Sequence, residues 1–300
     1  MKLGVMIGAD GSRNTLDDVI KTAQNVENAG LDNVWLANIF SFDAITTLAL
    51  IGRATQRIGL GTAVTPTYPR HPTAIAQQAL TTAAATNNRF TLGIGLSHQV
   101  VIETMLGMSY DKPAKHMREY LSVLMPLARG EQANFQGEQY KVQGVALDIP
   151  GAERLPVVIA GLGPVMLKLA AEMADGTNTW MVGPNTMDSH ILPALHKAGS
   201  SDPTVVAGLP IVLTTNVDAA KEKIAQDLTI YGQLPSYRAM LDREGAAGPA
   251  DIAIVGDENQ LRGAIKRFED MGVTDFNAAI MDTEEGAYDR TLEFLASVKG

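Results

Sequence analysis

Two glycines flank a leucine at the end of a short apolar run, in the segment Gly161-Leu162-Gly163-Pro164. Because glycine has no Cβ, the backbone of such a turn can approach a ligand closely. The proline starts a predicted helix, whose free amides and dipole attract a phosphate. A tight turn that needs glycine for its geometry alone has the same sequence. We therefore expect an anion-binding cradle at Gly161, Leu162 and Gly163, with a purely structural turn as the alternative.

Two polar residues at predicted strand ends are candidates for contact with a substrate or ligand. His98 is the only one of the five histidines at such a position, and an imidazole can transfer a proton near neutral pH. A solvated loop histidine is the alternative. Asn38 ends the second predicted strand, where its amide can hydrogen-bond a ligand or cap the following helix. His98 is thus the candidate catalytic residue, and Asn38 a candidate ligand contact.

Several kinds of catalysis lose support because their residues are missing. The chain has no cysteine, which excludes disulfides, a thiolate nucleophile and cysteine-ligated metals. It has no His-Glu-x-x-His motif, no cluster of carboxylates and histidines at metal spacing, and no strand-end lysine suited to a Schiff base. Metal-dependent hydrolysis and aldolase chemistry are therefore disfavoured. The remaining option is chemistry carried by a bound cofactor, which the protein positions.

The composition narrows the partners. The 24 Lys and Arg residues against 33 Asp and Glu give a net charge of −9, which disfavours nucleic acid and anionic membranes. No run of about 20 apolar residues is present, as a membrane span would require. The opening MKLGVMIGAD lacks the features of a signal peptide. We expect a cytoplasmic protein that acts on a small molecule.

The elements that must position these residues repeat as a short apolar run, a polar loop and a stretch of helical periodicity. The eight predicted strands are Leu3 to Gly8, Asn33 to Ala37, Ile58 to Val64, Phe90 to Leu96, Val157 to Ala160, Asn178 to Val182, Val205 to Leu213 and Asp275 to Met281. Eight such units predict an α/β fold, a (β/α)₈ TIM barrel over residues 1–300. A doubly wound sheet is the competing fold, but Gly8-Ala9-Asp10-Gly11-Ser12 does not match its Gly-x-Gly-x-x-Gly turn.

Two segments interrupt the repeat. Gly130 to Pro156 carries alternating residues around Gln136-Gly137 and predicts a hairpin insertion. An extra helical region at about 218–250 is broken at Pro235, and Asp251 to Val255 is expected to be extended. Because active sites of such barrels lie at the carboxyl ends of the strands, the strand-end residues are the site candidates.

These strand-end residues together resemble the bacterial luciferase-like flavin and deazaflavin oxidoreductases. Arg57 to Thr67 has the sequence RIGLGTAVTPT, which is similar to the third-strand signature of that family. The segments GLDNVW at 30–35, RFTLGIG at 89–95 and GLGP at 161–164 continue the resemblance. LPSYR at 234–238 and VGD at 255–257 resemble an actinobacterial branch that uses coenzyme F420. The resemblance extends over essentially the whole chain.

The resemblance implies a planar deazaflavin or flavin ring at the barrel mouth, with hydride moving between ring C5 of F420 and a substrate. It also implies a non-proline cis peptide between Ala63 and Val64, making a bulge behind the ring. The cofactor-binding residues that it implies are Asn38 at the polar edge, Thr62, Ala63, Val64 and Thr65 behind the ring, Gly95, Leu96, Ser97 and His98 along its edge, and Gly161, Leu162 and Gly163 at the phosphate. Relatives in the family are commonly dimers, so a homodimer is expected.

Two departures from the family pattern bear on the substrate. Its sugar-phosphate dehydrogenases have an Asp-His pair at the second strand end, where this chain has Asn38-Ile39, and their acidic proton donor falls near His98. No cluster of Lys and Arg near the strand ends suits a substrate phosphate. We therefore expect an F420-dependent oxidoreductase that reduces an activated double bond or imine. An FMN-dependent monooxygenase and a non-catalytic deazaflavin carrier are the alternatives.

Overall fold

Eight parallel strands close into a barrel in the computed structural model, which describes residues 1–8, 14–199 and 202–299. The barrel strands are β1 (Lys2–Ile7), β2 (Asn33–Leu36), β3 (Gly59–Thr62), β5 (Phe90–Gly95), β8 (Val157–Ile159), β9 (Gly176–Trp180), β10 (Thr204–Leu213) and β12 (Asp275–Ile280). Each pairs with the next, and β12 pairs with β1, which closes the sheet. The predicted TIM barrel is confirmed. Residues 9–12 of the Gly8 to Ser12 segment lie outside the described ranges.

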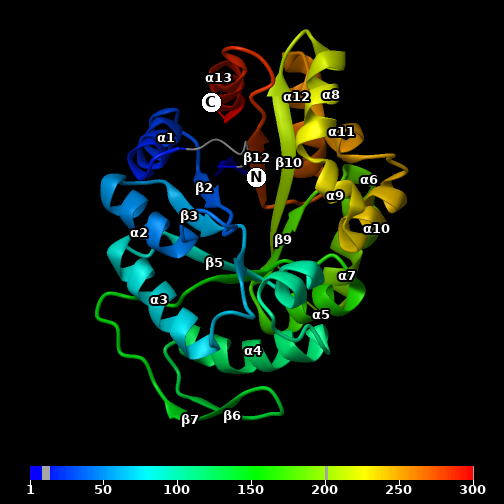
Figure 1. Ribbon diagram of the computed structural model, residues 1–300. Helices are drawn as coiled ribbons and strands as arrows, with labels where there is room; N and C mark the ends of the chain where they lie inside the picture. The colour runs from blue at the N-terminus through cyan, green and yellow to red at the C-terminus, as the bar shows by residue number, and fades with distance from the viewer. Residues whose placement is uncertain (9–13, 200–201, 300) are drawn as a thin grey trace.

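Helices form a ring around the strands, in chain order (Figure 1). They are α1 (Leu16–Asn28), α2 (Ala44–Ala54), α3 (Pro72–Ala85), α4 (Pro113–Ala128), α5 (Pro164–Met173), α6 (Pro184–Thr186), α7 (Leu192–Lys197), α8 (Val217–Asp227), α9 (Thr229–Gln233), α10 (Pro235–Glu244), α11 (Pro249–Ile252), α12 (Glu258–Asp270) and α13 (Ala287–Lys299). Two π-helical segments, η1 (Val100–Met105) and η2 (Met187–Ile191), complete the set. None of the described helices is long and apolar enough to span a membrane.

Local sequence explains where helices begin and which face they bury. Thr15 accepts a hydrogen bond from the amide of Asp18, whose side chain accepts from Thr15 in return. This capping box satisfies amides that the first helical turn leaves free. Val19, Ala23 and Val26 then form the buried stripe of α1, at the spacing of one helical face.

The interruptions of the repeat are largely as predicted. Antiparallel strands β6 (Ala133–Gln136) and β7 (Lys141–Val145) form the expected hairpin. The extra helical region contains α8 to α11, and a new helix begins at Pro235. The extended piece expected at Asp251 to Val255 is wrong in its first half, where α11 continues to Ile252. Pro249 in the first turn and the Asp251 side chain, which accepts from the Gly248 amide, favour a helix there.

The third barrel strand contains the expected break. Leu60 and Gly61 pair with Phe90 and Thr91 on β5. The short strand β4 (Thr65–Pro66) then pairs with Ile94 and Gly95. Three residues, 62–64, therefore lie opposite two residues of β5, 92–93, which is a bulge of one residue. The peptide between Ala63 and Val64 is cis, as the family resemblance implies.

A small cluster of side chains packs inside the barrel. Trp35, Val158 and Val206 lie on β2, β8 and β10, with Ala63 packed against them. These strands are not neighbours in the sheet, so their side chains meet across the barrel. This cluster forms the floor beneath the carboxyl ends of the strands.

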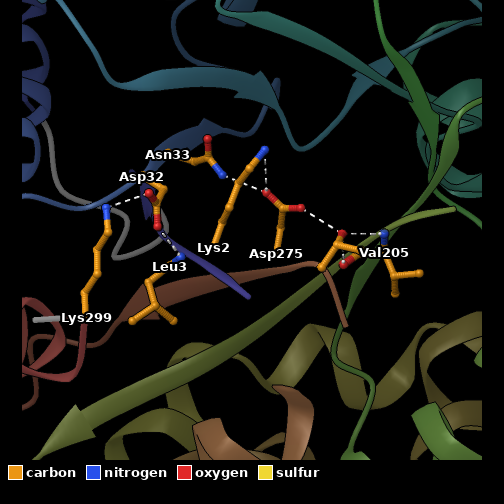
Figure 2. Close-up of polar contacts among 8 residues, drawn as sticks. Lys2, Leu3, Asp32, Asn33, Val205, Asp275 and Lys299 are labelled. Atoms are coloured by element: carbon orange, nitrogen blue, oxygen red, sulfur yellow. Dashed lines mark hydrogen bonds and ion pairs between the residues drawn. The ribbon is translucent and has the colours of Figure 1, made fainter. Parts of the chain in front are cut away.

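The opposite end of the barrel holds a polar network centred on Asp275 (Figure 2). Its carboxylate accepts from the Asn33 amide at 2.7 Å and from the Thr274 hydroxyl at 2.8 Å, and lies 4.0 Å from the Lys2 ammonium. The Thr274 hydroxyl in turn accepts from the Val205 amide. Because Lys2, Asn33 and Asp275 start their strands, this network stabilises the face away from the site.

Candidate functional site

The predicted site residues lie at the carboxyl ends of β2, β3, β5 and β8, which are four adjacent strands. Val64 of the bulge contacts the Gly95 position, because a Cβ built on Gly95 would lie 2.6 Å from a Val64 methyl. The same Cβ would be 3.2 Å from Ala160, the residue before Gly161. The bulge, the end of β5 and the start of the glycine turn are therefore contiguous.

The bulge is held rigidly from below. The Thr62 hydroxyl donates to the Gly93 carbonyl at 2.6 Å and accepts from the Gly93 amide at 2.8 Å. A Cβ on Gly93 would meet the Thr62 carbonyl oxygen at 1.9 Å, so only glycine fits there. Thr65 is fully buried, and its hydroxyl has no protein partner among the described residues. These contacts leave residues 62–65 as a preformed platform.

The segment Gly95 to His98 leaves β5 through an unusual backbone conformation. Ser97 has φ of 60°, in the left-handed region that side-chain-bearing residues seldom adopt. The His98 carbonyl then accepts from the amides of Val101 and Ile102, which starts η1. Such local conformations concentrate at functional sites. Sequence patterns do not reveal either feature.

His98 lies against aromatic side chains from a distant part of the chain. Its ring centroid is 5.7 Å from that of Tyr237 on α10. Tyr237 packs edge-on against Tyr231 of α9 at 5.2 Å, and Tyr231 packs against Trp180 at the end of β9. Burial lowers the pKa of the His98 imidazole and raises the pKa of the Tyr237 hydroxyl. Burial therefore favours the neutral form of the half-buried His98 imidazole. His98, Trp180, Tyr231 and Tyr237 together form an aromatic wall.

Asn38 performs the structural task that the sequence left open. Its side-chain oxygen accepts a hydrogen bond from the Ala44 amide at 2.9 Å. Asp43 accepts from the Thr46 amide in the same turn, so both side chains secure the start of α2. The Asn38 amide nitrogen stays available to a ligand, whereas its oxygen is engaged.

The glycine turn at the end of β8 has the geometry of an anion cradle. Gly163 is the N-cap of α5, and no side chain caps this helix. Because Pro164 has no N–H, the amides of Val165 and Met166 are the ones in the first turn that are free to bind an anion. A Cβ built on Gly163 would meet no atom within 4 Å, which shows open space beside the turn. The Leu162 carbonyl accepts from His190 of η2 at 2.8 Å. Residues 161–163 therefore fit a phosphate group.

A second aromatic group, which sequence reasoning missed, supports the β4 and β5 loops. Tyr68 stacks on His116 of α4, with ring centroids 4.0 Å apart, and on Tyr110 at 5.2 Å. Tyr110 donates to the Ser97 carbonyl at 3.3 Å. His116 contacts Gln139 of the hairpin insertion at 3.0 Å. The insertion is thus connected through stacked rings to the loop that carries His98.

Two basic side chains near the strand ends, those of Arg70 and Lys115, are paired with carboxylates. Arg70 donates to Asp43 at 2.7 Å, and Lys115 lies 2.6 Å from Glu138. In contrast, large apolar side chains of the loops after β2 and β5 are exposed; they are Ile39, Phe40, Phe42, Val100, Met105, Leu106 and Met108. Among the described residues, no group of three or more His, Cys, Asp or Glu side chains could hold a metal ion. The arrangement favours a neutral, apolar ligand above the platform.

Comparisons with known proteins agree with this geometry. A family model described as luciferase-like monooxygenase matches residues 1–275. The chain is 29% identical over 266 residues to a 5,10-methylenetetrahydromethanopterin reductase of Archaeoglobus fulgidus, covering 85% of this chain and 76% of that protein. It is 28% identical over 231 residues to an F420-dependent glucose-6-phosphate dehydrogenase of Nakamurella multipartita, covering 74% of this chain and 66% of that protein.

The fold is also similar to that of a solved structure. An F420-dependent secondary alcohol dehydrogenase, in complex with an F420-acetone adduct, superposes with a TM-score of 0.80 at 16% identity. The match covers 99% of this chain and 97% of the other. The family model matches more than nine tenths of this chain, and the barrel is closed and carries the bulge at Ala63-Val64. This chain therefore belongs to the luciferase-like family of oxidoreductases.

Proposed function

We propose that the protein is an F420-dependent oxidoreductase that transfers a hydride between the deazaflavin and a small organic substrate. The observation that carries this proposal is the contiguity of the bulge at residues 62–65 with the open glycine turn at 161–163. Relatives whose names specify F420 support the choice of cofactor. When bound, F420 supplies or accepts a hydride at C5 of its ring.

The residues of the chain have separate tasks in this proposal. Residues 62–65 would support the underside of the ring, residues 95–98 would lie along its edge, and residues 161–163 would hold the phosphate through backbone amides. The side-chain nitrogen of Asn38 would donate to the polar edge of the ring. Burial favours the neutral imidazole of His98. In the reduction of a double bond or imine, this imidazole would take up a proton from solvent and deliver it to the atom of the double bond that does not receive the hydride.

The substrate that best fits the mouth is neutral and apolar, with an activated double bond or imine. Phosphorylated sugars are disfavoured, because Arg70 and Lys115 are paired with carboxylates and Asn38-Ile39 replaces the Asp-His pair of the sugar-phosphate dehydrogenases. The aromatic wall of His98, Trp180, Tyr231 and Tyr237 offers flat apolar faces on which a conjugated molecule can pack.

A titration with F420 and with FMN, followed by fluorescence quenching, tests the cofactor. We expect F420 to bind and FMN to bind more weakly; tight binding of FMN alone refutes the proposal. The family description as monooxygenase favours an FMN enzyme that uses oxygen as the second candidate. Turnover of reduced F420 with a panel of enones and imines tests the reaction, and inertness across the panel favours a non-catalytic deazaflavin carrier.

We also propose that the protein acts in the cytoplasm, that it forms the homodimer implied by the family resemblance, and that it does not act on nucleic acid. Sedimentation velocity at micromolar concentration tests the dimer. A single species with the mass of one chain would contradict it.

A further inference from the structure

We infer that His190 is a positioning residue of the anion cradle, which orients the Gly163 amide toward the cofactor phosphate. This inference rests on the proposed function, because it assigns a task within the phosphate site of that function. His190 itself stays behind the turn and acts through the Leu162 peptide.

The contact that carries the inference joins two segments 28 residues apart in the chain. His190 Nε2 lies 2.8 Å from the Leu162 carbonyl oxygen. Since a carbonyl oxygen can only accept, the imidazole must carry its proton on Nε2 and donate it. The side chain is half-buried on η2. The partner of this histidine is thus the backbone of the cradle itself.

The geometry of the peptide bond converts this contact into an orientation. The Leu162 carbonyl and the Gly163 N–H belong to one planar trans peptide, so they point in opposite directions. A carbonyl held toward His190 therefore turns the Gly163 N–H away from η2. The open space beside Gly163 leaves that N–H accessible to a ligand.

The cradle needs such a restraint because of its sequence. Glycine populates backbone regions closed to other residues, so the peptide between Leu162 and Gly163 can rotate at low cost. The turn is held at a second point by Thr177, whose hydroxyl lies 3.5 Å from the Gly161 carbonyl oxygen. The same hydroxyl donates to the carbonyl of Ile159, the last residue of β8, at 2.9 Å. Both restraints hold carbonyl oxygens and leave amides for the anion. The alternative is that the His190 contact only packs η2 against the turn.

Two variants separate these alternatives. His190→Phe keeps a ring but removes the donor, whereas His190→Gln retains an N–H at a similar distance from the backbone. Dissociation constants are measured by fluorescence quenching for F420 and for its phosphate-free deazaflavin core. We expect His190→Phe to bind F420 about tenfold more weakly and the core within twofold of the wild type. His190→Gln restores most of the F420 affinity.

The outcomes distinguish this inference from the proposed function. Equal weakening of both ligands in His190→Phe, or unchanged affinity for both, overturns the positioning task alone. Wild-type protein that binds F420 no better than the phosphate-free core overturns the phosphate site and the inference together. Thermal melting of each variant verifies that the compared proteins are folded.

Discussion

Replacement of Gly163 with alanine tests the cradle most directly, because the structure predicts separate effects on folding and binding. The backbone at Gly163 has φ of −83° and ψ of 156°, which alanine adopts without strain. A Cβ there meets no protein atom within 4 Å. As an N-cap, alanine is less favourable than glycine and should lower the free energy of unfolding by less than about 1 kcal/mol. Alanine also reduces the conformational entropy of the unfolded chain, which raises the free energy of unfolding by about 0.4 to 1 kcal/mol and offsets that loss. We expect Tm to change by no more than about 3 °C.

The effect on binding is expected to be much larger. The new methyl group enters the space that we assign to the cofactor phosphate. Loss of one hydrogen bond to a charged group costs about 1.5 to 3 kcal/mol, which corresponds to a roughly 10- to 150-fold higher Kd. Fluorescence quenching with F420 measures the Kd, and thermal melting measures the stability.

Gly263→Ala in α12 is the matched control, because a Cβ there also meets nothing within 4 Å and the residue is far from the turn in sequence. It should leave the Kd unchanged and gain about 1 kcal/mol of stability, since glycine disfavours a helix interior. A Gly163→Ala protein with wild-type Kd and Tm would refute the cradle. A strongly lowered Tm would refute our account of the space around Gly163.

Three further predictions concern other parts of the molecule. Tyr237→Ala should raise the KM for an apolar substrate about tenfold because aromatic packing is lost, whereas the KM of Tyr237→Phe should stay within twofold of the wild-type value. Steady-state kinetics measure both values, and equal KM values for the two variants would contradict an aromatic wall. Burial holds the pKa of His98 below its value of about 6.5 in the unfolded chain. As the pH falls, the unfolded chain therefore binds a proton at His98 before the folded chain does. The stability that is present above pH 6.5 is lost as the pH falls below 6.5. Urea unfolding at pH 7.5 and 5.5 should show this loss, and His98→Gln should diminish it; an undiminished loss would count against His98. Asn33→Ala should lower the free energy of unfolding by about 1 to 3 kcal/mol, because it removes a hydrogen-bond donor to buried Asp275. Urea unfolding measures this loss. The Kd for F420 should stay unchanged, and an altered Kd would show coupling between the two ends of the barrel.

The sequence predicted the elements and their order because they depend on local patterns. Apolar runs such as 90–96 are typical of strands buried on both faces, and helical stripes such as that of α1 follow from spacing alone. The break at Ala63-Val64 was expected only through the family resemblance, since no local pattern indicates a cis peptide. The ends of the eight predicted strands lie within about two residues of the strand ends in the structure.

The site was only partly predictable, because most of its contacts join segments far apart in the chain. Asn38 looked equally suited to a ligand or a cap. Its side-chain oxygen accepts from the Ala44 amide and caps α2, which leaves its side-chain nitrogen for the ligand contact that we propose. His190 has the sequence context of an ordinary helical histidine, and only the fold brings it to Leu162.

Local sequence determined the barrel, its insertions and the glycine turn, since strand and helix propensity and turn geometry depend on near neighbours. Tertiary structure alone decided that Tyr237 meets His98 and that the hairpin reaches the His98 loop through Tyr68 and His116. The physical reason is that barrel closure and helix packing bring together residues of separate segments, 139 positions apart for His98 and Tyr237 and 48 positions apart for Tyr68 and His116. No pattern within one segment encodes such a contact.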